Sequence, residues 1–125
     1  MKNNNEIKEM SEVFQYRDKE YLLVFNLNVL KCVQEKYGSY DKWQGLIYPE
    51  DKKQECNIEA LLYGFKEMIN EGIDIQNEEA EEQMPFLTEK QVGRMLTELG
   101  IQKMQEKLLN AVKKSVDSKR NKSKN

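Results

Sequence analysis

The sequence predicts an α+β fold that is mainly α-helical, with an N-terminal β-hairpin followed by about four helices. Two observations lead to this prediction. Apolar residues up to position 25 alternate or run continuously over strand lengths, whereas those after Asn26 recur every three or four residues, as on a helix. Asparagine, serine and threonine caps and helix-ending glycines stand where the helical stretches meet.

The chain of 125 residues suits one domain, because 38% hydrophobic residues suffice for one modest core. We expect a flexible N-terminus over residues 1–11, a globular domain over 12–116 and a disordered basic tail over 117–125. The tail, DSKRNKSKN, contains nothing to bury.

The hairpin is expected to pair a short strand at 13–16 with an apolar strand at 21–25. Asp18 and Lys19 lie between them and fit a two-residue turn.

A helix over 27–37 should follow the second strand directly, with Asn26 as its N-cap and Gly38 at its end. Its apolar stripe is Leu27, Leu30, Val33 and Tyr37. A short helix over 39–46 is expected next, with Ser39 as its cap. Its inward-facing residues are Trp43 and Leu46, and Pro49 follows its end.

Asn57 fits the N-cap of a second long helix, and Gly72 fits its end. The apolar stripe of this helix is broad: Ile58, Leu61, Leu62, Phe65, Met68 and Ile69. Residues 73–87 are acidic and have no sustained period, so we expect a mobile connection that ends in the apolar run 84–87.

Thr88 and Gln91 fit a capping box at the start of a further helix, which Gly100 should end. The apolar residues of this helix are Val92, Met95, Leu96 and Leu99. A last helix over 101–116 places Ile101, Met104, Leu108, Val112 and Val116 on one face.

Composition excludes several classes of function. The chain has no histidine, and Cys32 and Cys56 lack the spacing of metal ligands, so we expect reduced thiols and no metal or cofactor. No pocket-forming set of carboxylates or nucleophile with its base can be recognised, which argues against an enzyme. No apolar run approaches the length of a membrane span, and a bacterial-type cytoplasm is expected.

A nucleic-acid role would need a basic surface, but the net charge is −2. Residues 88–106 nevertheless resemble a helix-turn-helix, and Gln102, Lys103 and Gln105 are suited to contact base edges. Any tight helical hairpin gives the same pattern.

Two apolar clusters fall outside the main helical stripes, near Pro49 and at 84–87. Aromatic and methionine side chains in such places mark a binding surface, or else close the ends of a small core. The candidate partner contacts are Trp43, Leu46, Tyr48, Met84, Phe86 and Leu87.

The order of these segments resembles the tail assembly chaperones of long-tailed bacteriophages over roughly residues 12–116. The segments are the hairpin FQYRDKEYLLVFN, the helix LNVLKCVQEKYGSYDKW, the middle helix IEALLYGFKEMINEG and the stretch LTEKQVGRMLTELGIQKMQEKLLNAVKKSV. The most specific parts are Lys36-Tyr37-Gly38-Ser39 and Leu61-Leu62-Tyr63-Gly64-Phe65.

The resemblance implies a small, mostly helical protein that binds the tape measure protein in the host cytoplasm and keeps it soluble. It further implies assistance to tail tube assembly and absence from the mature virion. The tail tube protein and a second copy of the chain are further candidate partners. Two alternatives stay open: a phage or prophage DNA-binding regulator that uses residues 88–106, and a structural tail or head-completion protein.

Overall fold

The computed structural model describes residues 11–123, with side chains as far as Ser115. Its elements are β1 (Glu12–Tyr16), β2 (Lys19–Leu23), α2 (Leu27–Tyr37), α3 (Tyr40–Ile47), α4 (Ile58–Asn77), α5 (Glu89–Leu99) and α6 (Ile101–Ser123). The predicted mainly helical α+β fold with an N-terminal hairpin is confirmed, with five helices across the described residues in place of about four.

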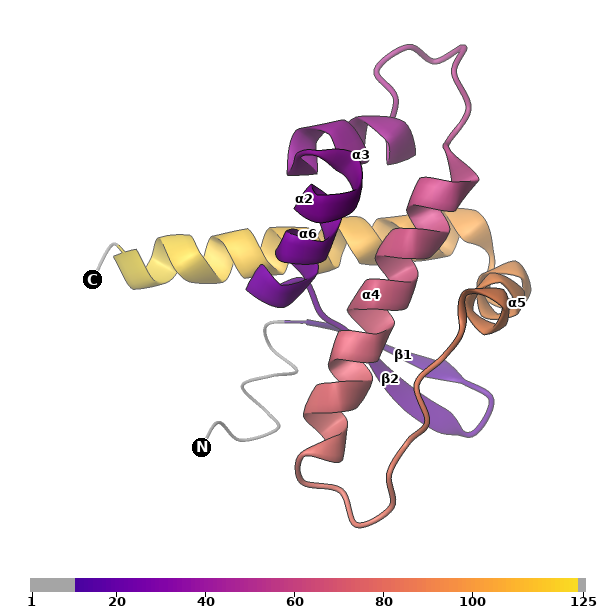
Figure 1. The fold of residues 1–125 in the computed structure, drawn as a ribbon, viewed down its shortest axis with the longest axis vertical. Coiled ribbons are helices and arrows are strands. Elements are labelled where there is room, and N and C mark those ends of the chain that lie inside the picture. Colours follow the sequence, from indigo (N-terminus) through magenta and orange to yellow (C-terminus); the bar gives the residue numbers. More distant parts are fainter. Residues whose placement is uncertain (1–10, 124–125) are drawn as a thin grey trace.

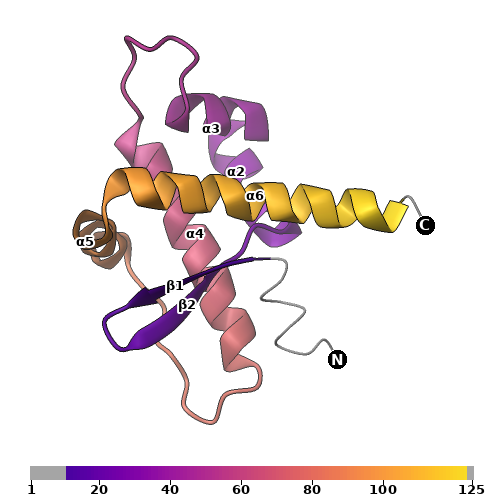
Figure 2. The ribbon, with the colours of Figure 1, turned by 180° about the vertical axis from the view of Figure 1, so that it is seen from behind.

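Helix α4 is the centre of the molecule (Figure 1). It contacts β2, α2, α3 and α5, and the hairpin also contacts α6. Figure 2, the view from behind, shows α6 crossing in front of α4, on the side where the hairpin lies. The buried residues of α4 are Ala60, Leu61, Gly64, Phe65, Met68, Ile69, Gly72 and Ile73.

The hairpin is antiparallel, and Tyr16 pairs with Lys19. The turn residues are therefore Arg17 and Asp18, one position earlier than predicted. Arg17 adopts the left-handed conformation with φ of 54°, which two-residue hairpin turns require. The second strand, β2, also ends earlier than predicted, at Leu23.

Gly72 does not end the central helix, contrary to the prediction. Helix α4 continues to Asn77, so residues 73–77 are helical and Ile73 is fully buried. A Cβ atom at Gly72 would overlap the backbone carbonyl oxygen of Leu22. Glycine is present here because it lets β2 lie directly on the helix.

The strand and the helix also share a hydrogen bond, from the Val24 amide to the Met68 carbonyl (3.3 Å). Both faces of β2 are buried. Leu22 faces α4 on one side, and the side chains of Tyr21 and Leu23, which point to the other side, are also covered. This explains why the second strand is a continuous apolar run rather than an alternating one.

The predicted caps of the next two helices are confirmed. The side chain of Asn26 accepts from the Val29 amide, that of Ser39 accepts from the Lys42 amide, and Gly38 ends α2 with φ of 92°. The stripe of α2 differs from the prediction, since Val29 is buried and Leu27 is 70% exposed. The two positions are about 200° apart around a helix, so they cannot face the same core.

The capping box at Thr88 and the break at Gly100 are confirmed as well. The last helix extends to Ser123 instead of ending near residue 116. The side chains of 116–123 and all of 124–125 are outside the described part, as are residues 1–10 of the predicted flexible N-terminus. Ser11 is described, and it is buried (1% exposed), so it belongs to the folded domain.

Replacement of Gly72 by alanine should lower the free energy of unfolding by about 1–3 kcal/mol, because a methyl group cannot share the space of the Leu22 carbonyl. Urea unfolding, followed by the fluorescence of Trp43, the single tryptophan, measures this change.

Gly45→Ala is the matched control, because nothing lies within 4 Å of a Cβ atom at this helical position. It should raise stability by about 0.5–1 kcal/mol. Equal stability of Gly72→Ala and the unaltered chain would show that β2 does not rest on α4 as described.

Candidate functional site

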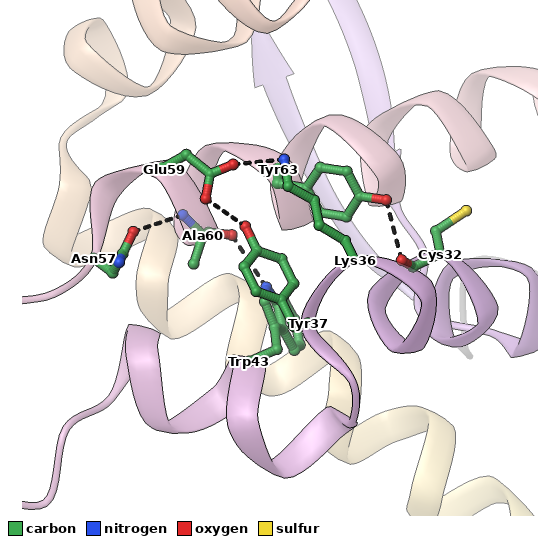
Figure 3. Close-up of polar contacts among 8 residues, drawn as sticks. All are labelled: Cys32, Lys36, Tyr37, Trp43, Asn57, Glu59, Ala60 and Tyr63. Atoms are coloured by element: carbon green, nitrogen blue, oxygen red, sulfur yellow. Dashed lines mark hydrogen bonds and ion pairs between the residues drawn. The ribbon is translucent and has the colours of Figure 1, made fainter.

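Trp43, predicted to contact a partner, lies in the core and is 1% exposed. Its ring stacks on Phe25, and its Nε1 donates a hydrogen bond to the Ala60 carbonyl oxygen at 3.1 Å (Figure 3). A Cβ atom at Gly64 would overlap this ring, so the glycine makes room for it. The structure therefore confirms that Trp43 faces inward from the short helix, and it leaves this side chain no exposed surface for a partner.

Leu46 and Tyr48 flank the buried Ile47 at the end of α3. Leu46 is 37% exposed rather than facing the body, because Ile47 occupies the inward position one turn after Trp43. Tyr48 is half-buried, and its hydroxyl donates to the Gln105 carbonyl oxygen, which joins α3 to α6. Burial raises the pKa of Tyr48 to about 12. Of Leu46 and Tyr48, only Leu46 is an exposed apolar residue.

Met84 and Leu87 are partly buried against the core, at the end of the loop after α4. The side-chain amide of Asn77 accepts from the Met84 amide (2.8 Å) and donates to its carbonyl (3.0 Å). Asn70 holds Leu87 in the same way (2.9 and 3.0 Å). The predicted mobile connection is thus helical to Asn77 and tied to α4 at its other end.

Phe86, between these two anchored residues, is 58% exposed. It borders a shallow hollow of about 200 Å³ over α2 and α4. The walls of this hollow include three carboxylates, those of Glu67, Glu71 and Asp74. Phe86 is therefore a single apolar group beside an acidic wall, not part of a continuous apolar patch.

A larger hollow, which the sequence did not predict, lies between α4 and the α5–α6 corner. We call it the α4–α5 groove. Its volume is about 550 Å³ and most of its surface is apolar. It is lined by Ile58, Leu61, Leu62, Lys90, Gly93, Arg94, Leu96, Thr97, Glu98 and Ile101.

The groove exists because apolar residues at two helix starts stay partly uncovered. Ile58 begins α4 and is 48% exposed, and Ile101 begins α6 and is 44% exposed. Both were predicted to join buried stripes. Gly93 leaves the floor open, since a Cβ atom there would make only an ordinary contact with Leu62, at 3.9 Å. The glycine in the middle of the predicted helix, Gly93, is the signal in the sequence that could have indicated the groove.

The charges that line the groove do not cancel. Lys90 and Arg94 are exposed, and within the described part of the chain neither makes an ion pair or a hydrogen bond. Glu98 is paired with Arg17 at 3.0 Å. Hydrogen bonds from Tyr16 and Arg17 lower the pKa of Glu98, so it stays ionised and compensated. The groove therefore combines apolar walls with two uncompensated positive charges.

A polar network joins α2 to α4 (Figure 3). Glu59 accepts from the Tyr37 hydroxyl at 2.7 Å and pairs with Lys36, and hydrogen bonds to both lower the pKa of Glu59. The Tyr63 hydroxyl donates to the Cys32 carbonyl oxygen at 3.2 Å. These groups satisfy one another, so the network holds the helices together and offers no reactive group.

Both cysteines are free thiols, as predicted. Burial raises the pKa of Cys32 and of Cys56 above the ordinary value, which keeps the thiols protonated and weakly nucleophilic at neutral pH. Over residues 11–115, whose side chains are described, no three side chains of metal-binding type gather in one place. No helix in the same range has the length and apolar content of a membrane span.

The three residues predicted to contact base edges differ in exposure. Gln102 and Lys103 are exposed, but Gln105 is partly buried next to Tyr48. Helix α6 packs along the hairpin, with Lys107 donating to the Val13 carbonyl oxygen at 3.1 Å. It is therefore held against the body on one side rather than projecting as a separate helix.

Comparison of the chain with models of protein families, with curated proteins and with solved structures gave no match. The groove and the sequence pattern are therefore the features of the chain that bear on its function.

The six tyrosines provide a test of the packing of the domain. Each has a raised pKa, with burial as the largest cause, and the values for Tyr48 and Tyr63 are about 12. In the unfolded chain they ionise near 10, so the folded state holds more protons above this pH. Stability should be unaffected by these groups below pH 10 and should fall as the pH rises above it.

Near-ultraviolet absorbance during an alkaline titration measures tyrosinate, and Trp43 fluorescence reports unfolding in the same samples. We expect tyrosinate to appear only above pH 10 and together with unfolding. Ionisation of several tyrosines at their ordinary pKa in a chain that is still folded would contradict the described packing.

Proposed function

We propose that this chain is a binding protein that covers an apolar helical segment of a longer protein, and specifically a phage tail assembly chaperone for the tape measure protein. The observation that carries the proposal is the α4–α5 groove, where Ile58 and Ile101 remain about half exposed at the mouth of an open apolar hollow. Exposed apolar surface of this kind serves association with a partner.

The shape of the groove favours a helical partner. It lies between packed helices, and side chains of a third helix fit between two others as ridges into a groove. Helix-in-groove recognition uses apolar anchors spaced by three and four residues, as a long tape measure helix would supply. Such a helix aggregates until its own partners arrive, and a reversible cover would prevent this.

The phage assignment rests on the sequence pattern, in particular the strand that leads directly into a helix and the stretch 61–65. In this proposal the protein acts in the host cytoplasm, helps the tail tube to assemble around the tape measure protein and is absent from the mature virion. It performs no catalysis and needs no cofactor.

Co-expression with the long helical protein encoded nearby tests the proposal. The unaltered chain should raise the soluble yield of that protein and co-purify with it. Ile58→Gln combined with Ile101→Gln should weaken the complex roughly thirtyfold, because each half-exposed isoleucine contributes about 1 kcal/mol when its remaining surface is buried.

Leu27→Gln is the matched control, since Leu27 is 70% exposed and does not line the groove. It should leave the complex unchanged. Phe86→Ala should also have little effect if the groove alone is the binding surface. The proposal fails if the unaltered chain neither binds nor solubilises the long protein, or if the groove variant and Leu27→Gln behave alike.

A further inference from the structure

We infer that the α4–α5 groove takes an amphipathic helix whose apolar stripe is bordered on one side by carboxylates, which pair with Lys90 and Arg94. This inference rests on the proposed function and adds the chemistry of the bound segment.

The charges that line the groove are the first observation in favour of an acidic segment. Lys90 and Arg94 line it, both are exposed, and in the described structure neither has an ion pair or a hydrogen bond. Glu98, the single carboxylate among the lining residues, is already paired with Arg17 at 3.0 Å. A bound segment therefore meets two positive charges and no free negative one.

The spacing of the two basic residues is the second observation. Lys90 and Arg94 are four residues apart on α5, so their side chains stand one above the other on one face of the helix. Carboxylates three or four residues apart on a partner helix have the same separation. The arginine guanidinium can bind a carboxylate through two parallel hydrogen bonds. Pairing of this kind fixes the direction and register of a helix more than it adds affinity.

A second copy of this chain does not supply such a segment. Helix α4 carries Glu67, Glu71 and Asp74 four and three residues apart, but its apolar stripe is buried in the core of its own chain. The exposed run Glu78, Glu79, Glu81 and Glu82 follows the end of α4 instead of lying on a helix. Helix α5 itself carries the positive charges. The charges therefore favour a different protein as the occupant.

Two synthetic peptides provide the probe. They share one leucine stripe at helical spacing and differ only in the residues on one flank, which are glutamate in one peptide and lysine in the other. Fluorescence anisotropy should show at least tenfold tighter binding of the glutamate peptide at low salt, and the difference should shrink as salt is added. Lys90→Glu combined with Arg94→Glu should reverse the preference.

Lys31→Glu combined with Lys42→Glu is the matched control, because it changes the net charge equally at exposed positions on α2 and α3. It should leave the order of the two peptides unchanged, and Trp43 fluorescence verifies that all variants fold.

Equal binding of both peptides that depends on Ile58 and Ile101 but not on Lys90 and Arg94 would overturn the inference and leave the apolar groove as the binding site. Failure of both peptides to bind, with an intact complex of the long helical protein, would also overturn it. Self-association that Ile58→Gln and Ile101→Gln abolish, measured by sedimentation, would assign the groove to a second copy.

Discussion

The position of the hairpin depends on the close contact between strand β2 and the backbone of helix α4. At Gly72 the carbonyl of Leu22 occupies the space of a side chain, and nearby the Val24 amide donates to the Met68 carbonyl. The hairpin can approach α4 this closely only where the helix has no Cβ atom. Because β2 is covered on one side by α4 and the hairpin is contacted by α6 as well, the three buried residues of β2, Tyr21, Leu22 and Leu23, are apolar or aromatic on both faces.

The incomplete cover of α4 explains the position of the α4–α5 groove. The hairpin covers α4 at Met68 and Gly72, and α2 and α3 contact its first turns at Glu59 and Ala60. Helix α5 lies against the same turns at Leu61 and Leu62, where the groove stays open. Ile58 and Leu62 line the groove, and Gly93 gives Leu62 no side chain to pack against. Apolar residues that would complete a core elsewhere are left facing solvent here. A small domain has few other places for a stable apolar hollow, since most of its large side chains are needed to close the core.

Local signals in the sequence located most helix ends. Asn26, Ser39, Asn57 and Thr88 all cap helices, because a cap depends only on the next few residues. The prediction was wrong at Gly72, where the reason for the glycine is a strand fifty positions earlier in the chain. It was right that Trp43 faces inward but wrong for Leu46, because hydrophobicity alone could not show that Ile47 rather than its neighbour Leu46 turns inward one turn after Trp43.

The groove was harder to predict than the elements that form it. Its walls come from the starts of two helices and the middle of a third, and their relative positions follow from packing rather than from spacing. Ile58 and Ile101 each fitted a stripe that looked fully buried. The positive charges on Lys90 and Arg94 were visible in the sequence, but nothing there showed that Glu98 is engaged by Arg17 from the hairpin.

Helix α6 separates two ends of the molecule. It begins beside the groove at Ile101 and runs away from it past the hairpin (Figure 2), where Lys107 and Lys114 bind the backbone of Val13 and Ser11. Changes to the far end of this helix therefore leave the groove and its charges in place. A segment attached at the far end of α6 would project away from the α4–α5 groove and would leave it uncovered.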